Sequence, residues 1–541
     1  MKKLLLIFSF LPLFLSSQNS SIYQLVYEDR LDKSDTLGIS YREVSVENEK
    51  KSFITISPYP IIFIHGLSGT GSSWNPFGVH INQNANFSWG GELEFCLENY
   101  NFSTPQDACQ IPSDILSFIP SSLPVADYYR IEFDCYWDGT CNNNNSEWLL
   151  SNQAAITKQG YALGIAIDKV LNATGKNKII LVGHSMGGLA AREYVQNSSH
   201  WIGNSHRVAK LVTSGTPHGG SNSTSLGIGL GGINEKSEAV RDLRESYTSG
   251  HLGAYLVGGI PESDSYIWNN LFWDYKNVDV TCDGDENDFI TGLNFKSIPY
   301  DIDYVSIASS YSGNDDGVVD YYNANLSNYK FTPYFEFFNA NNYVHSASLM
   351  LTNPSATGHL TEANYINFKS LDEPDNKDMA YDIDLGNAYT GFLTFQGDYM
   401  PNRDYDEDYY RFSVNQLSYV LVSVSNLPTN SYVSLLSSQN TIITQTGPNV
   451  FFSSFVSPGV YYIKIEGAAY GNTIPGSYPW QKPYSFLIDY SLVNSVFDEY
   501  LSKERSLIKS VDVLGRESNN QHQPLFYIYD DGTVEKRIVV E

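Results

Sequence analysis

The stretch Lys178–Tyr194, KIILVGHSMGGLAAREY, indicates the fold of the chain. Its apolar run Ile179–Val182 is typical of a strand buried on both faces, because only a covered parallel sheet tolerates four such residues in succession. The residues from Gly183 to Gly187 read GHSMG, and a helical pattern opens after them. A buried strand, a tight turn and a helix are therefore expected in this order.

The turn matches the Gly-x-Ser-x-Gly pattern of a nucleophile elbow, with Ser185 at its centre. Gly183 and Gly187 lack a Cβ where one would collide, and the strained turn presents the Ser185 hydroxyl at the edge of the sheet. The hydroxyl also lies at a helix N-terminus, whose dipole favours a developing negative charge. We interpret Ser185 as a catalytic nucleophile. The alternative, a glycine-rich turn without chemistry, is disfavoured by the strand and helix that flank it.

A second stretch with chemical meaning begins at Pro60–Ile64, a short apolar strand that runs into His65–Gly71, HGLSGTG. A strand that ends in His-Gly and a flexible glycine loop can present a backbone N–H toward the nucleophile. We assign that donor to Leu67 and the second donor to Met186, which follows Ser185. Together they would form an oxyanion hole. A glycine loop without chemistry is the alternative.

Strands and helices alternate around these two stretches. The pattern predicts a helix over Gln153–Leu171 that ends at Gly175, and further strands at Tyr128–Tyr136, Val208–Thr213 and Asp303–Ala308. Such alternation indicates a doubly wound, mostly parallel sheet.

The composition limits the possible partners. The 541 residues are too many for one core and favour two to four domains. The 33 basic and 60 acidic residues give a formal charge of −27, which repels nucleic acid and anionic membrane surfaces. We therefore expect no nucleic acid partner.

The N-terminus indicates export. Met1–Ser17 carries two lysines, a short apolar run and small residues at its end, as in a cleaved signal peptide. No later segment is apolar for long enough to span a membrane.

The cysteines also suit export. Two pairs of neighbours in the sequence, Cys96 with Cys109 and Cys135 with Cys141, could form disulfides that close short loops in an oxidising compartment, and Cys282 then has no partner in this pairing. A zinc site is disfavoured, because these residues form no CxxC pair.

Three motifs, HGLSGTGSSW, GHSMGG and LVTSGTPHGGS, occur in this order. The region Tyr59–Asp372 that carries them resembles the bacterial triacylglycerol lipases of the α/β-hydrolase fold and their inositol-deacylase-like relatives. The resemblance implies an α/β-hydrolase catalytic domain over residues 18–371 that cleaves carboxylic esters of lipids. It also implies that His218, in the third motif, shapes the site and is not a base.

The acid of the triad should follow the strand Asp303–Ala308, because α/β-hydrolases carry Ser, Asp and His in this chain order. The segment SGNDDGVV follows that strand. The resemblance favours Asp316, since those lipases carry their acid in an NDG-type turn before two apolar residues. The neighbouring Asp315 stays open as the alternative.

The base must come later in the chain, where only His345, His359 and His522 remain. His359 opens HLTEANYINF, which resembles the stretch that carries the base in the bacterial lipases. His345 lies in an expected strand, where a buried core histidine is the ordinary interpretation. We predict His359 as the base and keep His345 as the alternative; His522 lies in the C-terminal tail.

Residues 222–300 occupy the place where such hydrolases carry a lid. A glycine-rich run and an aromatic cluster could serve as its hinge and apolar face, although buried packing of the same aromatics is an equal alternative. Within this region Asp279, Asp283 and Asp285 resemble the start of a calcium loop, but Ile290 stands where the last, bidentate glutamate would be needed. Calcium is a possible structural ion here, and a solvated acidic loop is the alternative. No cofactor is required for the chemistry.

Two further units follow the catalytic domain. Residues 372–492 contain short alternating strands that predict an all-β sandwich, and DEDYYRF and SPGVYYI within it resemble the pre-peptidase C-terminal domain of secreted bacterial hydrolases. Residues 493–541 end in three short strand patterns that resemble the C-terminal sorting domain of the type IX secretion pathway. That resemblance implies the secretion machinery as a partner, and a secreted or cell-surface protein that passes through the periplasm.

The sequence thus predicts a secreted lipase or esterase with the triad Ser185, His359 and Asp316. An acyltransferase or amidase with the same triad would use the same acyl-enzyme. A surface-binding adhesin with an inactive hydrolase domain is the alternative from another class.

Overall fold

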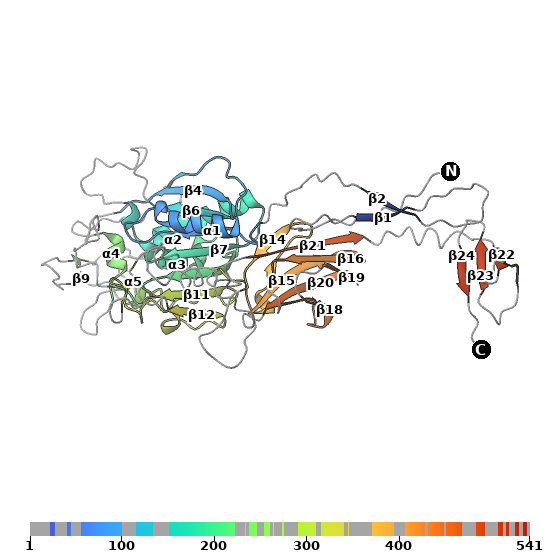
Figure 1. Cartoon of the computed structure of the whole chain (residues 1–541). Coiled ribbons are helices and arrows are strands. Elements are labelled where there is room, and N and C mark those ends of the chain that lie inside the picture. Colours follow the sequence, from blue (N-terminus) through green and yellow to red (C-terminus); the bar gives the residue numbers. More distant parts are fainter. Residues whose placement is uncertain are drawn as a thin grey trace, which may run out of the picture.

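The computed structural model describes residues 22–26, 40–44, 56–99, 115–133, 151–221, 233, 237–245, 254–259, 263–264, 273–274, 290–309, 315–339, 345, 371–393, 406–427, 431–447, 451–467, 483–492, 507–511, 516–518, 525–529 and 534–537. Two large units dominate these residues, a mixed α/β unit and a unit of β-strands (Figure 1).

The α/β unit is built on one sheet of eight strands in the order β12-β11-β8-β7-β3-β6-β4-β5. Seven strands run parallel, and only the edge strand β5 pairs antiparallel with its neighbour β4. The strands are β3 (Ile61–Ile64), β4 (Trp89–Cys96), β5 (Leu116–Phe118), β6 (Tyr128–Glu132), β7 (Ile179–His184), β8 (Val208–Ser214), β11 (Asp303–Ala308) and β12 (Phe335–Asn339). The predicted α/β-hydrolase fold is confirmed.

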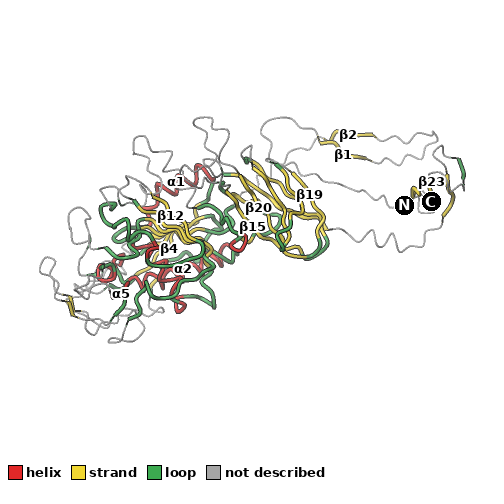
Figure 2. Tube along the Cα trace, turned by 90° about the horizontal axis from the view of Figure 1, so that it is seen from below, coloured by secondary structure: helices red, strands yellow, loops and turns green. Residues whose placement is uncertain are grey.

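Helices cover both faces of this sheet, as Figure 2 shows for α1 and α2. Alternate residues of β3 separate the two faces: Ile61 and Phe63 pack in one core with helix α1, and Ile62 and Ile64 pack in another with helices α2 and α3. The helices are α1 (Asn75–Ala85), α2 (Ile156–Thr174), α3 (Met186–Gln196), α4 (Glu238–Asp242) and α5 (Ala254–Val257). Short 3-10 helices are η1 (Gly71–Trp74), η3 (Ser151–Gln153), η4 (Ser198–His200), η6 (Leu326–Asn328) and η7 (Lys377–Met379).

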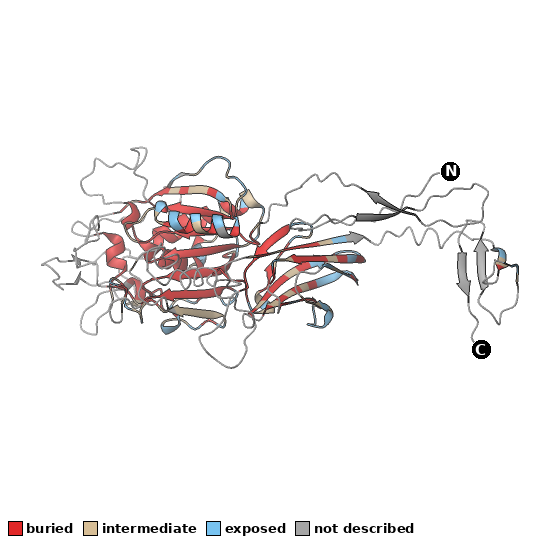
Figure 3. Ribbon diagram, viewed as in Figure 1, coloured by how far each residue is buried: buried red, intermediate tan, exposed pale blue. Residues whose placement is uncertain are grey.

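Burial explains why the sheet strands read as unbroken apolar runs. Every residue of β3, β7, β8 and β11 is buried, and β7 and β11 are red in Figure 3. Helix α2 ends at Thr174, and Gly175, where the sequence predicts the end, caps it in the left-handed conformation (φ 69°), which glycine adopts without steric cost.

The second unit consists of two sheets with the strand orders β13-β15-β20-β17-β18 and β14-β21-β16-β19. Their strands are β13 (Tyr381–Asp382), β14 (Ala388–Gly391), β15 (Asp406–Val414), β16 (Ser418–Ser425), β17 (Ser431–Ser437), β18 (Ile442–Thr446), β19 (Phe451–Val456), β20 (Gly459–Gly467) and β21 (Tyr484–Leu492). Buried residues of both sheets share one core, as in a β-sandwich.

The sandwich packs directly on the α/β unit. Tyr59, just before β3, packs edge-on against Tyr381 with ring centroids 4.9 Å apart, and its hydroxyl accepts a hydrogen bond from the Asp382 N–H at 2.7 Å. One continuous hydrophobic core includes residues of α1, the central sheet and both sandwich sheets. The two units are therefore joined by a buried interface and not only by a linker.

Three small sheets complete the described part. Strands β1 (Ile22–Val26) and β2 (Ser40–Val44) pair with each other in a separate two-stranded sheet. Strands β9 (Ser263–Asp264) and β10 (Trp273–Asp274) pair within the expected lid region. Strands β22 (Leu507–Val511), β23 (Leu525–Tyr529) and β24 (Val534–Arg537) form an antiparallel sheet in the tail. None of the described helices is long and apolar enough to cross a membrane.

Candidate active site

Ser185 lies in a sharp turn between β7 and α3. Its backbone has φ 54° and ψ −128°, a conformation that residues other than glycine rarely adopt. A Cβ on Gly183 would lie 2.5 Å from the Gly188 nitrogen, and one on Gly187 would lie 2.5 Å from the His65 carbonyl oxygen. Both glycines are therefore required by close backbone contacts, and the strand-turn-helix geometry is that of a nucleophile elbow.

The imidazole at this serine belongs to His345. Its Nε2 lies 2.9 Å from Ser185 Oγ, within the range of a hydrogen bond. The sequence interpretation preferred His359 here and kept His345 as the alternative; the structure places this alternative, His345, at Ser185. His345 follows the end of β12 by six positions, at the carboxyl edge of the sheet where Ser185 also lies. His359 lies outside the described residues.

Asp316 completes the row of hydrogen bonds. Its Oδ2 accepts from His345 Nδ1 at 2.8 Å, and its Oδ1 accepts from the N–H groups of Val318 and Val319 at 2.9 and 2.8 Å. Its backbone carbonyl also accepts the His345 N–H at 3.0 Å. The alternative, Asp315, accepts instead from the Gly317 N–H. The acid predicted from the sequence is thus the carboxylate at His345, fixed by a turn of its own.

A second histidine packs against His345. The ring of His184 is buried, and its centroid lies 4.7 Å from that of the His345 ring. Burial, and then the neighbouring His345 and His65, hold the pKa of His184 well below 6.5. His184 therefore remains neutral beside the imidazole that contacts Ser185.

The residues chosen for the oxyanion hole lie beside the nucleophile. A Cβ on Gly66 would lie only 2.7 Å from the Cβ of Ser185, so the start of the loop after β3 touches the elbow. Leu67 packs against the apolar cluster that contains Met186. Met186 is the first residue of α3, where backbone N–H groups have no partner within the helix.

The third motif supports the elbow from the other side. The carbonyl of Ser214, at the end of β8, accepts the Ser185 N–H at 2.8 Å. His218 is fully buried and contacts Arg192 at 3.2 Å and Thr213 at 3.2 Å. Burial, and then the charge of Arg192, hold the pKa of His218 well below 6.5. His218 thus occupies the structural position expected from the sequence.

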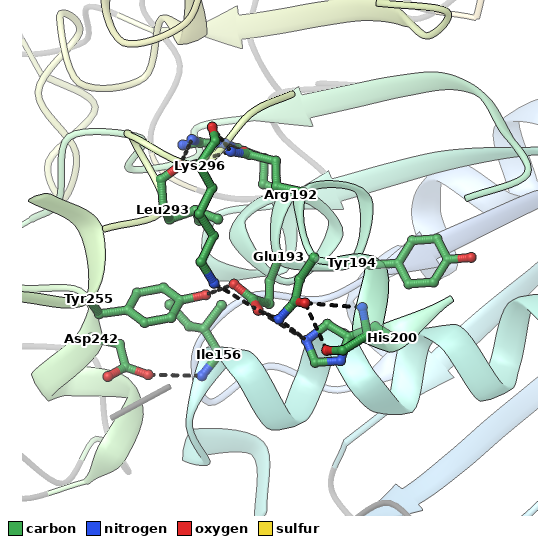
Figure 4. A network of polar contacts seen from close by, with 12 residues as sticks. Ile156, Arg192, Glu193, Tyr194, His200, Asp242, Tyr255, Leu293 and Lys296 are labelled. Atoms are coloured by element: carbon green, nitrogen blue, oxygen red, sulfur yellow. Dashed lines mark hydrogen bonds and ion pairs between the residues drawn. The ribbon is translucent and has the colours of Figure 1, made fainter. Parts of the chain in front are cut away.

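A buried polar network anchors the nucleophile helix, and the sequence reasoning did not find it (Figure 4). Glu193 of α3 accepts from the Tyr255 hydroxyl at 2.7 Å and lies 3.0 Å from His200 Nε2 and 3.6 Å from Lys296 Nζ. Burial raises the pKa of Glu193, but the hydrogen bond with His200 and the charge of Lys296 outweigh it and bring the pKa to about 2. The carboxylate remains ionised and ties α3 to α5 and to the segment before β11.

Carboxylates gather at the junction of the two large units. The side-chain oxygens of Asp372, Glu373 and Asp408 lie within 4.8 Å of one another, and the same holds for Asp372, Asp375 and Asp406. Asp408 is fully buried; its Oδ2 accepts from the Tyr484 hydroxyl at 2.6 Å, whereas its Oδ1 has no hydrogen-bond partner among the residues that the structure describes. Oxygen ligands in this number suit a hard divalent cation such as Ca²⁺. These five residues could hold a structural ion far from Ser185 in the chain.

Other expected site features fall on residues that the structure does not describe. The calcium loop at Asp279, Asp283 and Asp285 and the signal peptide at residues 1–17 lie outside the described residues, as does most of the expected lid. Cys96 is disulfide-bonded, and the other four cysteines lie outside the described residues. The pairing with Cys109 stays a prediction.

Two family models match parts of the chain. A model of the PGAP1-like alpha/beta domain matches residues 55–228, and a model of lecithin:cholesterol acyltransferase matches residues 147–329. Both matched segments contain Ser185, and the second also contains Asp316. No curated protein matches the chain.

Solved structures that match this chain include bacterial hydrolases. The mature form of lipase BlEst2 from Bacillus licheniformis is 15% identical, with 57% of this chain and 95% of that chain covered and a TM-score of 0.28. Naproxen esterase from Bacillus subtilis is 14% identical, with 58% and 82% covered and a TM-score of 0.25. The pre-peptidase C-terminal domain of a collagenase from Bacillus anthracis is 16% identical, with 22% and 99% covered and a TM-score of 0.16.

Proposed function

We propose that this chain is a secreted serine hydrolase that cleaves carboxylic esters of lipids. The observation that carries the proposal is the unbroken row of hydrogen bonds from Asp316 through His345 to Ser185. A nucleophile, a base and a carboxylate that orients the base are the three groups that acyl transfer through a serine requires.

In the proposed reaction, Ser185 Oγ attacks the ester carbonyl while its proton passes to His345 Nε2. The Oγ–carbon bond forms, and the tetrahedral intermediate then expels the alcohol, which takes the proton from His345. Water attacks the resulting acyl-enzyme in the same way and releases the carboxylic acid and Ser185. Asp316 accepts from Nδ1 throughout, so it fixes the orientation of the ring and stabilises its charged form.

The amides of Leu67 and Met186 are the proposed donors to the oxyanion. Both residues lie beside Ser185, one in the loop after β3 and the other at the start of α3. Removal of one such donor typically costs about 3 to 4 kcal/mol of transition-state stabilisation.

Lipid esters are the proposed substrate class because both matching family models describe α/β-hydrolase domains and one of them takes its name from a lipid acyltransferase. That same match favours acyl transfer as a second candidate. The two activities share the acyl-enzyme and differ only in whether water or an alcohol accepts the acyl group.

A fluorescent alkylphosphonate tests the proposal most simply. Wild-type protein should be labelled, and Ser185→Ala should not be labelled while it keeps the same circular dichroism. Wild-type enzyme that has not been treated with the phosphonate should hydrolyse p-nitrophenyl esters, and product analysis with an added sterol or alcohol would separate hydrolysis from transfer. Folded wild-type protein that takes up no label would instead support the adhesin alternative.

Export is a proposal of the same kind. It is supported by the signal-like Met1–Ser17 and by the tail, whose described strands β22, β23 and β24 form one small sheet. If the tail is a type IX sorting domain, the intact mass of protein from the native medium should lack both ends. Free protein that still ends at Glu541 would contradict the sorting role.

A further inference from the structure

The loop His65–Gly71 is the least regular part of the proposed active site. It joins β3 to η1 through a turn in which Ser68 has φ 53° and the Gly69 N–H donates to the Gly66 carbonyl at 3.0 Å. Neither a strand nor a helix fixes its shape, yet Gly66 touches Ser185. Some other contact must hold the Leu67 amide in one place if that amide is to serve the oxyanion.

His65 holds the first end of this loop. The side chain is fully buried; Nδ1 donates to the Gly66 carbonyl at 2.8 Å, and Nε2 accepts the Phe133 N–H at 3.1 Å. Together these two hydrogen bonds define a neutral ring with its hydrogen on Nδ1. Glu132 Oε1 lies 3.3 Å from the same Nε2. Since Nε2 accepts the backbone hydrogen bond, we treat the carboxylate as a neighbour of the ring and not as its acceptor.

Glu132 holds the other end. Its Oε2 accepts the Gly71 N–H at 2.7 Å, a short charge-assisted hydrogen bond that is buried. Arg130, two positions earlier on β6, donates to the Gly71 carbonyl at 3.3 Å. The carboxylate of Glu132 is thus in contact with the first and the last residue of the loop, and it comes from β6, which pairs with β3.

We propose that Glu132 is a positioning residue for the oxyanion loop, acting through its hydrogen bond with the Gly71 N–H. The inference rests on the proposed function and deepens it. The bond fixes the end of the loop relative to β6, and His65 fixes its start relative to β3. Preorganised donors need no rearrangement in the transition state, and a displacement of about 1 Å can cost about a hundredfold in rate.

The hydrogen bond can be removed from either side. Glu132→Leu removes the acceptor, and Glu132→Gln keeps a carbonyl that can accept from Gly71. Gly71→Pro removes the donor: Gly71 is the first residue of η1, where proline is tolerated, and Thr70 before it is extended (φ −138°, ψ 167°), as a residue before proline should be. Gly71→Ala is the matched control, because it adds a Cβ at the same position and keeps the N–H.

We expect Glu132→Leu and Gly71→Pro each to lower kcat by about ten- to a hundredfold with KM changed less than about threefold, because the oxyanion contact forms mainly in the transition state. Glu132→Gln and Gly71→Ala should each stay within about fivefold of wild type, because both keep a hydrogen bond between these positions. The double variant Glu132→Leu/Gly71→Pro should be no slower than the slower single variant, since both changes remove one interaction.

Phosphonate labelling separates failure of this inference from failure of the proposed function. Suppose that wild-type protein is labelled and turns over esters. If Glu132→Leu and Gly71→Pro then keep the wild-type kcat and lose only thermal stability, Glu132 has a purely structural role and the inference is overturned. Additive losses in the double variant would overturn it as well. If Ser185 in the wild-type protein takes no label, the proposed function itself has failed. Should Glu132→Leu not fold, the comparison of Gly71→Pro with Gly71→Ala decides alone.

Discussion

His345 Nε2 lies 2.9 Å from Ser185 Oγ, although 160 positions separate the two residues in the chain. The central strand β7 carries the serine, and the edge strand β12 leads to the histidine. Parallel strands bring their carboxyl ends to one edge of a sheet, which is where open α/β sheets place their sites. The contact is therefore a product of topology.

The first prediction concerns the acid. Asp316→Asn should lower kcat by about 10⁴-fold, because an amide at this position can favour the wrong tautomer of the base. Asp315→Asn is the matched control and should retain most activity, since Asp315 bonds to the Gly317 N–H. Steady-state hydrolysis of a short p-nitrophenyl ester measures both. An inactive Asp315→Asn variant beside an active Asp316→Asn variant would show that Asp315, and not Asp316, is the acid of the triad.

The second prediction concerns acid stability. The folded pKa of Glu193 is about 2, below its ordinary value of 4.5, so its contribution to the free energy of unfolding is fully present above about pH 4.5 and is lost as pH falls toward 2. The shift corresponds to a stabilisation on the order of 3 kcal/mol. His200, Lys296 and Tyr255 face the carboxylate.

Urea unfolding of Glu193→Gln from pH 6 to pH 3 measures this contribution. The variant should be less stable than wild type at pH 6, and the difference should shrink toward pH 3. A constant difference across this range would show that the loss comes from packing and not from the charge of Glu193.

The third prediction concerns the carboxylates at the junction. Because Asp372, Glu373 and Asp408 crowd their oxygens in a buried place, a divalent cation that bridges them should stabilise the folded state. CaCl₂ should raise the melting temperature of EDTA-treated protein, and the gain should be smaller in Asp408→Asn. Asp378→Asn, which alters an exposed carboxylate nearby, should respond as wild type does. Identical melting curves in EDTA and in CaCl₂ would show that the cluster binds no calcium.

The catalytic sheet could be predicted from sequence because its strands are buried on both faces and read as apolar runs. Asp303–Ala308 is β11 at the predicted bounds, and Val208–Thr213 is β8 less one residue. The acid of the triad could also be predicted from the sequence, because Asp316 lies in a short turn that a local sequence pattern identifies. In the sandwich, strand β18, IITQT, is mostly exposed, so its sequence does not show the alternation of apolar and polar residues that indicates a half-buried strand.

The base of the triad could not be identified from a local pattern, because the position of His345 depends on a strand that the sequence analysis did not predict. In β12, FEFFN, the residues Phe335–Phe338 are half-buried and the strand lies at the edge of the sheet, so it lacks the apolar run of the central strands. Once β12 is known as the last parallel strand, the first histidine after it, His345, is the natural candidate. The carboxylate cluster was missed for a similar reason, since residues 372–375 and 406–408 meet only through the pairing of the sandwich strands.

The most direct test of the account compares two histidine variants of the mature protein on a short p-nitrophenyl ester. His345→Ala should lose about a million-fold in kcat, as is typical when the base of a serine triad is removed, and it should keep the wild-type circular dichroism. His359→Ala should retain substantial turnover. A folded His345→Ala that remains active, beside an inactive His359→Ala, would contradict the assignment of His345 as the base and with it the proposed triad.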